Sequence, residues 1–391
     1  MQVAHLCKID PDANNNRVYI MTDLGNGSFQ VEYGRVGVAR MMKKEYPMSF
    51  WKEILNKHLA EGYIDRTAEF NISAKTVRQE NGYAPIENEA VADFVNFLLV
   101  ASKRVVQQNY TVEHDQVSKE MIEAAQDTIF RISQSTDLND MRELYKALFV
   151  IIPRKMKDVA AALPSSLEEG YEKLLEEQSL LDALKTVKQE SVRSNISQKT
   201  ILDTVGLRVR EVTDLEKAQI KKHLTSESAH LYKRAFRVEN IRTEERFREY
   251  CKAHGIYDKY IHYYYHGSGN ANYWGIATEG LLLNPKAPIT GKMFGYGLYF
   301  APRARKSIGY TSLQGSYWRH GGSDRAYLAV FKVAFKNPSH TQTCHGYTRL
   351  HHAPKGHDAV FAHAGVELYN DEVIVYNEAQ CTIQYLIEIG K

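Results

Sequence analysis

The chain has 391 residues, which is enough for two or three domains with ample hydrophobic core. Hydrophobic residues make up 43% of the sequence and charged residues 25%, and both fractions are ordinary for soluble globular proteins. No apolar run reaches membrane-spanning length and the N-terminus lacks a signal-peptide pattern, so we expect an intracellular protein with no membrane partner.

The first segment, residues 1–75, has the pattern of a small sheet that carries a helix. Short strands are predicted at Val18–Met21 and Phe29–Tyr33, on either side of a turn at Gly25–Gly27. Apolar residues on one helical face predict a helix at Phe50–Leu59.

A basic stretch lies inside this segment. Between Arg35 and Lys57, six basic residues stand against two acidic ones. A patch of this kind suits the phosphates of a nucleic acid. The alternative is an ordinary solvated face, and charge alone favours that alternative.

The middle segment, residues 85–215, is predicted to be all helical. Apolar stripes predict helices at Ile86–Gln107, Ser118–Gln134 and Leu138–Ile152. Ser165 and Glu168 have the spacing of a capping box, which predicts the start of another helix there. The stripes are typical of core contacts and include no metal or cofactor ligands. We expect a helical bundle.

The last segment, residues 220–391, is predicted to be a mostly antiparallel, β-rich domain with few helices. Turn signals separate its predicted strands, which are Tyr260–His266, Gly297–Ala301, Ala326–Phe335, Glu372–Tyr376 and Asn377–Ile389. The segment has neither GxGxxG after a strand nor GxxxxGK[ST], which excludes a Rossmann or P-loop nucleotide site. From Lys221 onward the net charge is +8, which suits a ligand that carries a pyrophosphate.

The four cysteines are scattered along the chain, at Cys7, Cys251, Cys344 and Cys381. They form no CxxC pair, so we expect reduced, structural thiols. Cys344 and His345 lie near two further histidines, but the spacing matches no familiar metal site, and we expect no metal.

Three groups of residues in the last segment carry the chemistry. They are His266-Gly267-Ser268, then Gly297-Leu298-Tyr299-Phe300-Ala301, then Glu372. In this order and setting the chain resembles the poly(ADP-ribose) polymerase family in its short, DNA-dependent form. The resemblance covers nearly the whole chain, because Tyr33-Gly34-Arg35 stands where the family has the Trp-Gly-Arg of its WGR domain.

The resemblance implies a multidomain α+β fold. Residues 1–75 correspond to a WGR-like domain that binds DNA ends, residues 85–215 to a helical regulatory domain, and residues 220–391 to an ADP-ribosyltransferase domain. NAD is then the substrate and no metal is required.

The resemblance also implies roles at the nicotinamide end of NAD. His266 binds ribose hydroxyls, and the backbone of Gly267 binds the nicotinamide amide. Tyr299 and Tyr310 form aromatic walls, and Ser307 donates to the carboxamide. Taken alone, a turn histidine or a strand tyrosine is ordinary structure.

Further roles concern the rest of the substrates. Ser268 and Asn272 line the adenosine side, and Lys306 lies near the incoming acceptor. Glu372 binds the ribose hydroxyl and activates the acceptor. The neighbouring Asp371 points to the opposite face of a strand, so one of the two serves, and the register selects Glu372.

Leaving of nicotinamide builds positive charge on the ribose, as in glycoside cleavage. A carboxylate at the 2′-hydroxyl stabilises that charge more in the transition state than in the ground state. Two positions depart from the family. Leu282 stands where many relatives have arginine, and Lys292 stands where they often have tyrosine. We expect Lys292 to supply the positive charge that Leu282 lacks.

For DNA, the resemblance assigns sugar stacking to Tyr33 and a link to the helical domain to Arg35, with Arg40, Lys43 and Lys44 at the phosphates. The expected function is transfer of ADP-ribose from NAD to proteins, including the enzyme itself, and extension into chains when DNA breaks are present. An accessory factor that directs acceptor choice is a further partner to consider. Deleting about Asn88–Thr213 is expected to give activity without DNA.

Two alternatives remain open: a mono-ADP-ribosyltransferase of the same fold, and a non-catalytic scaffold that binds DNA ends. The intact His266, Tyr299 and Glu372 argue against the scaffold. We expect a nuclear protein if the source is eukaryotic, and a cytoplasmic or nucleoid-associated one if it is bacterial.

Overall fold

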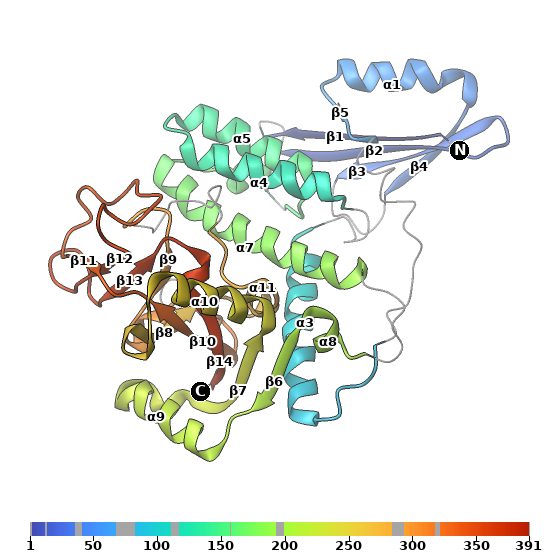
Figure 1. The fold of residues 1–391 in the computed structure, drawn as a ribbon. Helices are drawn as coiled ribbons and strands as arrows, with labels where there is room; N and C mark the ends of the chain where they lie inside the picture. Colours follow the sequence, from blue (N-terminus) through green and yellow to red (C-terminus); the bar gives the residue numbers. More distant parts are fainter. Residues whose placement is uncertain are drawn as a thin grey trace. The chain divides into compact units, whose positions relative to one another are not determined.

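The structure, a computed structural model, describes residues 2–11, 14–35, 41–67, 83–110, 117–156, 158–192, 199–283, 293–316 and 321–390 (Figure 1). It divides into two compact units. The first unit consists of Met1–Glu80 and Arg104–Arg193, and the second of Asn81–Lys103 and Ser194–Lys391. No helix among the described residues is long and apolar enough to cross a membrane.

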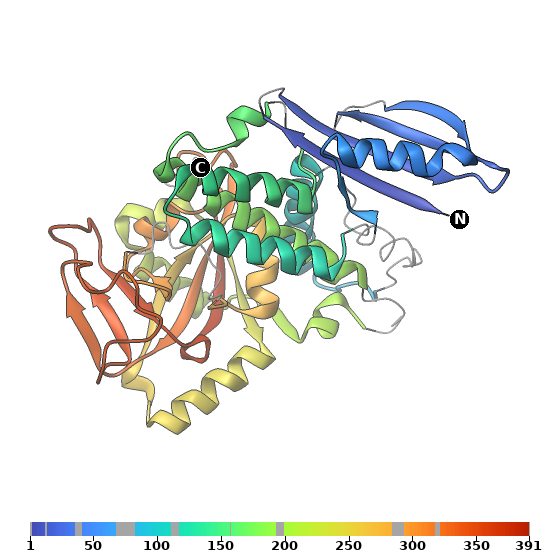
Figure 2. The same ribbon diagram turned by 90° about the horizontal axis from the view of Figure 1, so that it is seen from above.

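The first unit begins with a five-stranded antiparallel sheet of order β4-β3-β2-β1-β5. Its strands are β1 (Val3–Asp10), β2 (Asn15–Asp23), β3 (Ser28–Arg35), β4 (Met42–Pro47) and β5 (Ile64–Asp65). Helix α1 (Trp51–Ala60) lies along one face (Figure 2), where Trp51 packs edge-on against Phe29 with ring centroids 5.0 Å apart. The predicted strands and helix are present. Strands β1, β4 and β5 were not predicted; the residues of β4 are mostly exposed and half of them are charged.

The rest of the first unit is helical. Its helices are α4 (Lys119–Gln134), α5 (Leu138–Ile151), α6 (Val159–Ala162) and α7 (Leu167–Val192). Ser118 and Asp137 cap α4 and α5 through their side chains. The predicted capping box is shifted by one residue. The Ser166 hydroxyl accepts from the N–H of Glu169, whose carboxylate accepts from the N–H of Ser165.

The second unit contains two sheets. The larger is antiparallel, of order β6-β7-β14-β10-β8. Its strands are β6 (Leu207–Glu211), β7 (Tyr232–Asn240), β14 (Cys381–Gly390), β10 (Arg325–Ala334) and β8 (Ile261–Gly267). The smaller has order β11-β12-β13-β9, with β11 (Pro338–Thr341), β12 (Ala359–Ala362), β13 (Glu372–Val375) and β9 (Leu298–Phe300). One pair, β11 with β12, is parallel. The predicted α+β class and mostly antiparallel pairing are confirmed.

The second unit also contains five α-helices besides the first part of α3, counted over its described residues. They are α8 (Ile201–Val205), α9 (Asp214–Ser228), α10 (Ile241–His254), α11 (Tyr273–Glu279) and α12 (Ala304–Ile308). Of these, α8 lies in the segment predicted to be helical, and α10, α11 and α12 lie wholly within residues 220–391; these three were not individually predicted, because they bury few side chains. Helix α10, for example, buries only Thr243, Phe247 and Cys251, so its apolar pattern is weak.

Helix α3 (Glu89–Asn109) belongs to both units. The division falls between Lys103 and Arg104. Its first part contributes Phe94 to the core of the second unit, where the ring stacks on Phe236 at 4.4 Å between centroids. The predicted helical domain, residues 85–215, therefore includes a part of α3 that packs in the second unit, and the domain bounds themselves stay a prediction.

Candidate active site

His266 stands near the end of β8, opposite Ala329 of β10. Its Nδ1 lies 3.0 Å from the backbone oxygen of Tyr299. Because a carbonyl oxygen can only accept, Nδ1 carries the hydrogen of this bond. The interaction fixes the orientation of the imidazole ring and ties β8 to β9.

Tyr299 lies at the centre of β9. Its hydroxyl donates to the carbonyl of Gly295 and accepts from the N–H of Phe294, both at 2.9 Å. Burial raises the pKa of Tyr299, so the phenol stays neutral. The resemblance assigns this ring to nicotinamide stacking. Its position is fixed by the backbone in β9 and by the two hydrogen bonds of the hydroxyl.

Gly267 follows His266 and meets helix α12 at very short range. A Cβ at this position would lie 1.8 Å from the backbone oxygen of Ser307 and 3.1 Å from the Cβ of Tyr310. The close approach requires glycine. Ser307 is buried, whereas Tyr310 is partly exposed, with a pKa raised to about 12 by burial and then by Glu372. The structure therefore brings Gly267, Ser307 and Tyr310 together.

Glu372 opens strand β13, and its carboxylate forms an ion pair with the ammonium of Lys306 on α12. Their side chains are 11% and 12% exposed, so the pair is largely out of water. Burial raises the pKa of Glu372, and the nearby Lys306 opposes that rise. Tyr299 pairs with Ile374, two residues from Glu372, so the ring and the carboxylate share one face of the sheet.

Asp371 has a different task. Its carboxylate accepts from the N–H of Ala364 at 2.8 Å and so closes the turn that precedes β13. Asp371 is thus engaged in the turn, and the choice of Glu372 as the catalytic carboxylate stays a prediction.

Ser268 and Asn272 lie side by side beyond Gly267. The Asn272 amide donates to the Ser268 hydroxyl at 3.1 Å. The departure at Leu282 is a 55% exposed side chain. Lys292, predicted to compensate for it, falls outside the described residues, and so does Arg40 of the predicted DNA-binding set.

The other predicted DNA-binding residues lie on the N-terminal sheet. Tyr33 is partly buried and stacks on Tyr19, with ring centroids 5.7 Å apart. The Arg35 guanidinium donates to the Asn14 side chain at 3.1 Å. Lys43 pairs with Glu32, and Lys44 lies 4.7 Å from the ring centroid of Tyr46. Lys43 and Lys44 are exposed on β4, whereas Tyr33 is largely committed to packing within the domain.

Sequence reasoning missed two features of the site. It placed Lys306 near the acceptor but not in contact with Glu372, since the residues are far apart in the chain. It also missed Tyr273, whose hydroxyl touches the backbone on both sides of Gly267. No local pattern signals a buried tyrosine of this kind, because its partners are set by the tertiary fold.

Comparison with known proteins adds to this geometry. Residues 211–319 match the poly(ADP-ribose) polymerase catalytic domain. Uncharacterized protein 101L of Invertebrate iridescent virus 6 is 29% identical over 194 residues, 49% of this chain and 80% of that protein. Poly(ADP-ribose) polymerase 2 of Arabidopsis thaliana is 23% identical over 466 aligned residues, 96% of this chain and 71% of that protein.

Poly(ADP-ribose) polymerase 2-B of Oryza sativa subsp. japonica is 25% identical over 331 residues, and the match spans 76% of this chain and 53% of that protein. The chain thus covers about half the length of the rice relative. The predicted enzyme class, an ADP-ribosyltransferase with NAD as substrate, is confirmed for the catalytic domain.

Proposed function

We propose that this chain, which carries a poly(ADP-ribose) polymerase catalytic domain, transfers ADP-ribose from NAD to proteins, including itself, and extends the product into chains when it meets DNA ends. The buried Glu372–Lys306 pair carries this proposal. It sets a carboxylate and an ammonium beside Tyr310, on the same sheet face as Tyr299.

The chemistry follows from these positions. Backbone groups of Gly267 and the hydroxyl of Ser307 hold the carboxamide, while Tyr299 and Tyr310 confine the ring by stacking. The bond between nicotinamide and C1′ of the ribose breaks, and nicotinamide leaves with the electron pair. Glu372, bound to the 2′-hydroxyl, stabilises the cation that forms.

The acceptor then completes the reaction. Its nucleophilic oxygen attacks C1′, and its proton passes to Glu372 acting as general base. In chain extension the attacking hydroxyl belongs to an ADP-ribose unit already attached. Lys306 leaves the carboxylate as the substrates enter and lies where it can contact the acceptor.

Contacts within the first unit link its N-terminal sheet to its helical part, which a DNA signal would have to reach. The Asn16 amide donates to the carbonyl of Arg154 at 3.1 Å, and the N–H of Val159 donates to Asn14 at 2.9 Å. These bonds join the N-terminal sheet to the helical part. We propose that DNA ends bind near the exposed lysines of β4 and bias the helical part between a closed and an open state.

The test is nicotinamide release and product size with labelled NAD, with and without cut DNA. A ladder of products that grows strongly with cut DNA is the expected outcome. A single modified band would favour the mono-ADP-ribosyltransferase. No nicotinamide release under either condition would leave only a scaffold, and equal activity with and without DNA would contradict DNA activation.

A further inference from the structure

Tyr273, the first residue of α11, is fully buried and follows the loop of residues 268–272 that leaves β8. Its hydroxyl accepts from the N–H of Ser268 at 3.0 Å and lies 3.3 Å from the carbonyl oxygen of His266, to which it donates. One hydroxyl thus contacts both peptide groups that flank Gly267.

These two peptide groups also carry the backbone atoms of Gly267. The N–H of Gly267 belongs to the same peptide plane as the His266 carbonyl, and its C=O to the same plane as the Ser268 N–H. In a trans peptide the N–H and C=O point in opposite directions. Because Tyr273 bonds the His266 C=O and the Ser268 N–H on one side of the chain, the N–H and C=O of Gly267 point to the opposite side.

The side to which Gly267 points is the edge of β8 that lies next to β9, as the neighbouring residues show. Two residues earlier, Tyr265 exchanges two backbone hydrogen bonds with Ala301, each of 2.9 Å. Along a strand, residues two apart present their backbone groups to the same edge. Gly267 therefore presents its N–H and C=O to the same edge of β8 as the Tyr265–Ala301 pair, and offers a carboxamide one donor and one acceptor there.

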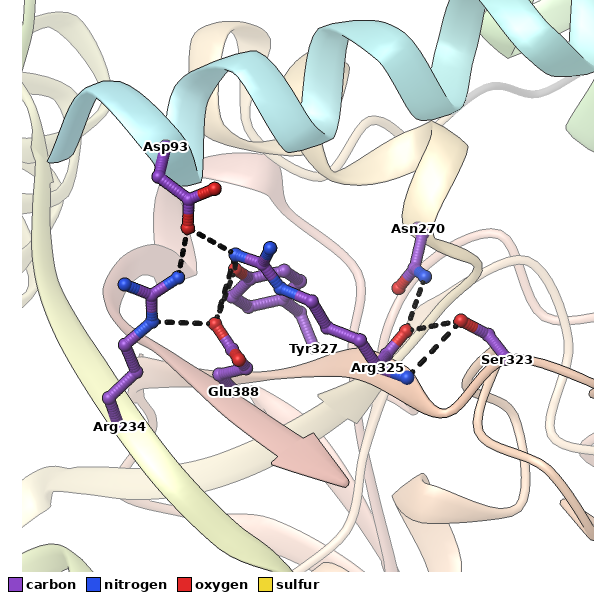
Figure 3. A network of polar contacts seen from close by, with 7 residues as sticks. All are labelled: Asp93, Arg234, Asn270, Ser323, Arg325, Tyr327 and Glu388. Atoms are coloured by element: carbon purple, nitrogen blue, oxygen red, sulfur yellow. Dashed lines mark hydrogen bonds and ion pairs between the residues drawn. The ribbon is translucent and has the colours of Figure 1, made fainter. Parts of the chain in front are cut away.

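A polar cluster, drawn in Figure 3, includes Tyr327, whose ring contacts that of Tyr273. The ring of Tyr273 meets Tyr327 edge-on, with centroids 6.5 Å apart. The Tyr327 hydroxyl donates to Glu388 at 2.9 Å and accepts from Arg325 at 2.7 Å. Arg325 in turn bonds Asp93 of α3 at 3.0 Å. With Arg234, which pairs with both acids, the cluster has two positive and two negative groups.

The loop of residues 268–272 is held at one point by helix α3 and at another by β10. The Ser102 hydroxyl donates to the carbonyl of Ala271 at 2.6 Å. The Asn270 amide donates to the backbone oxygen of Arg325 at 2.9 Å, and the guanidinium of Arg325 lies over the ring of Phe97 at 4.1 Å. Hydrogen bonds to α3 and β10 therefore restrain the residues between His266 and Tyr273.

We propose that Tyr273 is a positioning residue for recognition of the nicotinamide carboxamide, and that the first part of α3 supports it through Ser102 and Asp93. This inference rests on the proposed function. It assigns to α3, which the sequence placed in a regulatory bundle, a structural share in substrate binding.

The experiment uses the full chain with Tyr273→Phe, which keeps the ring and removes the hydroxyl. Nicotinamide binding is measured by calorimetry, and nicotinamide inhibition and KM for NAD by nicotinamide release. We expect nicotinamide to bind about tenfold more weakly and KM to rise by a similar factor, since the partly buried N–H of Ser268 loses this partner. At saturating NAD, kcat is expected to change less than threefold.

Tyr385→Phe is the matched control. This tyrosine also loses a hydroxyl with two side-chain partners, Arg237 and Glu216, within the same unit but away from the loop. It should lose some stability and leave nicotinamide affinity unchanged. Equal affinity in wild type and Tyr273→Phe, or an equal loss in the control, would overturn the role of Tyr273.

Ser102→Ala tests the contribution of α3. We expect about threefold weaker nicotinamide binding, whereas Ser133→Ala, which removes a buried hydroxyl from α4, should leave it unchanged. An unchanged affinity in Ser102→Ala would remove α3 from the proposal. If the wild-type chain neither binds nor releases nicotinamide, the proposed function is overturned as well. If the wild-type chain releases nicotinamide and the nicotinamide affinity of Tyr273→Phe is unchanged, only the positioning role is overturned.

Discussion

At the scale of single residues, the pairing of Glu372 with Lys306 has the largest chemical consequence. Glu372→Gln keeps the size of the side chain but removes the negative charge that stabilises the ribose cation. We expect chain formation to fall at least about a hundredfold, within the range known for loss of an electrostatic stabiliser. Asp371→Asn is the neighbouring control and should retain activity within about threefold. The measurement is incorporation of labelled NAD.

The same pair predicts an unusual pH dependence. Because burial raises the pKa of Glu372, its carboxylate gains a proton at a higher pH than an exposed glutamate does. Activity requires the ionised form, so kcat/KM should fall as the pH drops through this raised pKa. Lys306→Met removes the group that lowers the pKa and should move the acid limb to higher pH.

Lys332→Met is the matched control for the pH profile. Lys332 also forms a largely buried ion pair, with Glu244, in the same unit. Its loss should reduce stability without moving the acid limb. An acid limb that stays in place in Lys306→Met would show that Lys306 does not set the ionisation of Glu372.

At the scale of elements, the helical part of the first unit contains a buried ion pair between Arg154 and Glu177, whose side chains are each 12% exposed. Burial raises the pKa of Glu177, and the Arg154 guanidinium lies 5.0 Å from the ring centroid of Tyr110. Desolvating two charges offsets much of their attraction. We infer that the pair keeps this bundle less stable than an apolar core would.

Two variants test this inference. Glu177→Ala leaves Arg154 buried without its carboxylate and should destabilise the bundle by about 3–5 kcal/mol, whereas Arg154→Met with Glu177→Leu should stabilise it by about 1–4 kcal/mol. If opening of the bundle activates the enzyme, the first variant should release nicotinamide without DNA and the second should need more DNA. Chemical unfolding and nicotinamide release give both readouts, and variants that change stability but not DNA dependence would contradict the gating.

The elements also show what sequence can and cannot predict. The apolar stripe of the predicted helix Ile86–Gln107, which includes Val91, Phe94 and Leu98, correctly predicted a helix and its buried face. A stripe does not specify the surface that it packs against. Register predicted Glu372 as the carboxylate of the site, because strand alternation is local. The contact of Glu372 with Lys306 and that of Tyr273 with Ser268 depend on how distant segments meet, which no local pattern encodes.

At the scale of the whole molecule, the division of the chain changes how autoinhibition should be tested. Deleting Asn88–Thr213 also removes Phe94, with the rest of α3, and strand β6 of the larger sheet. We expect that variant to be insoluble rather than active. A chain of residues 83–103 joined to residues 199–391 keeps these core elements.

The linker in this shortened chain must span the length of α3, because Ala84 bonds the carbonyl of Lys199 at 2.9 Å. That length is about 25 Å at 1.5 Å per residue, which roughly 25 Gly and Ser residues cover. We expect a soluble enzyme that releases nicotinamide equally with and without DNA. A soluble but inactive product would contradict autoinhibition by the removed part.

The shared helix α3 also sets a limit on any opening of the first unit. The part of α3 up to Lys103 packs in the second unit, in a core that includes Phe94 and Phe236. The part from Arg104 onward belongs to the first unit. Amide hydrogens exchange with solvent at rates set by the stability of the cooperative unit that protects them. Within one unbroken helix, deuterium should therefore enter quickly after Arg104 and slowly before it, and DNA should widen that contrast.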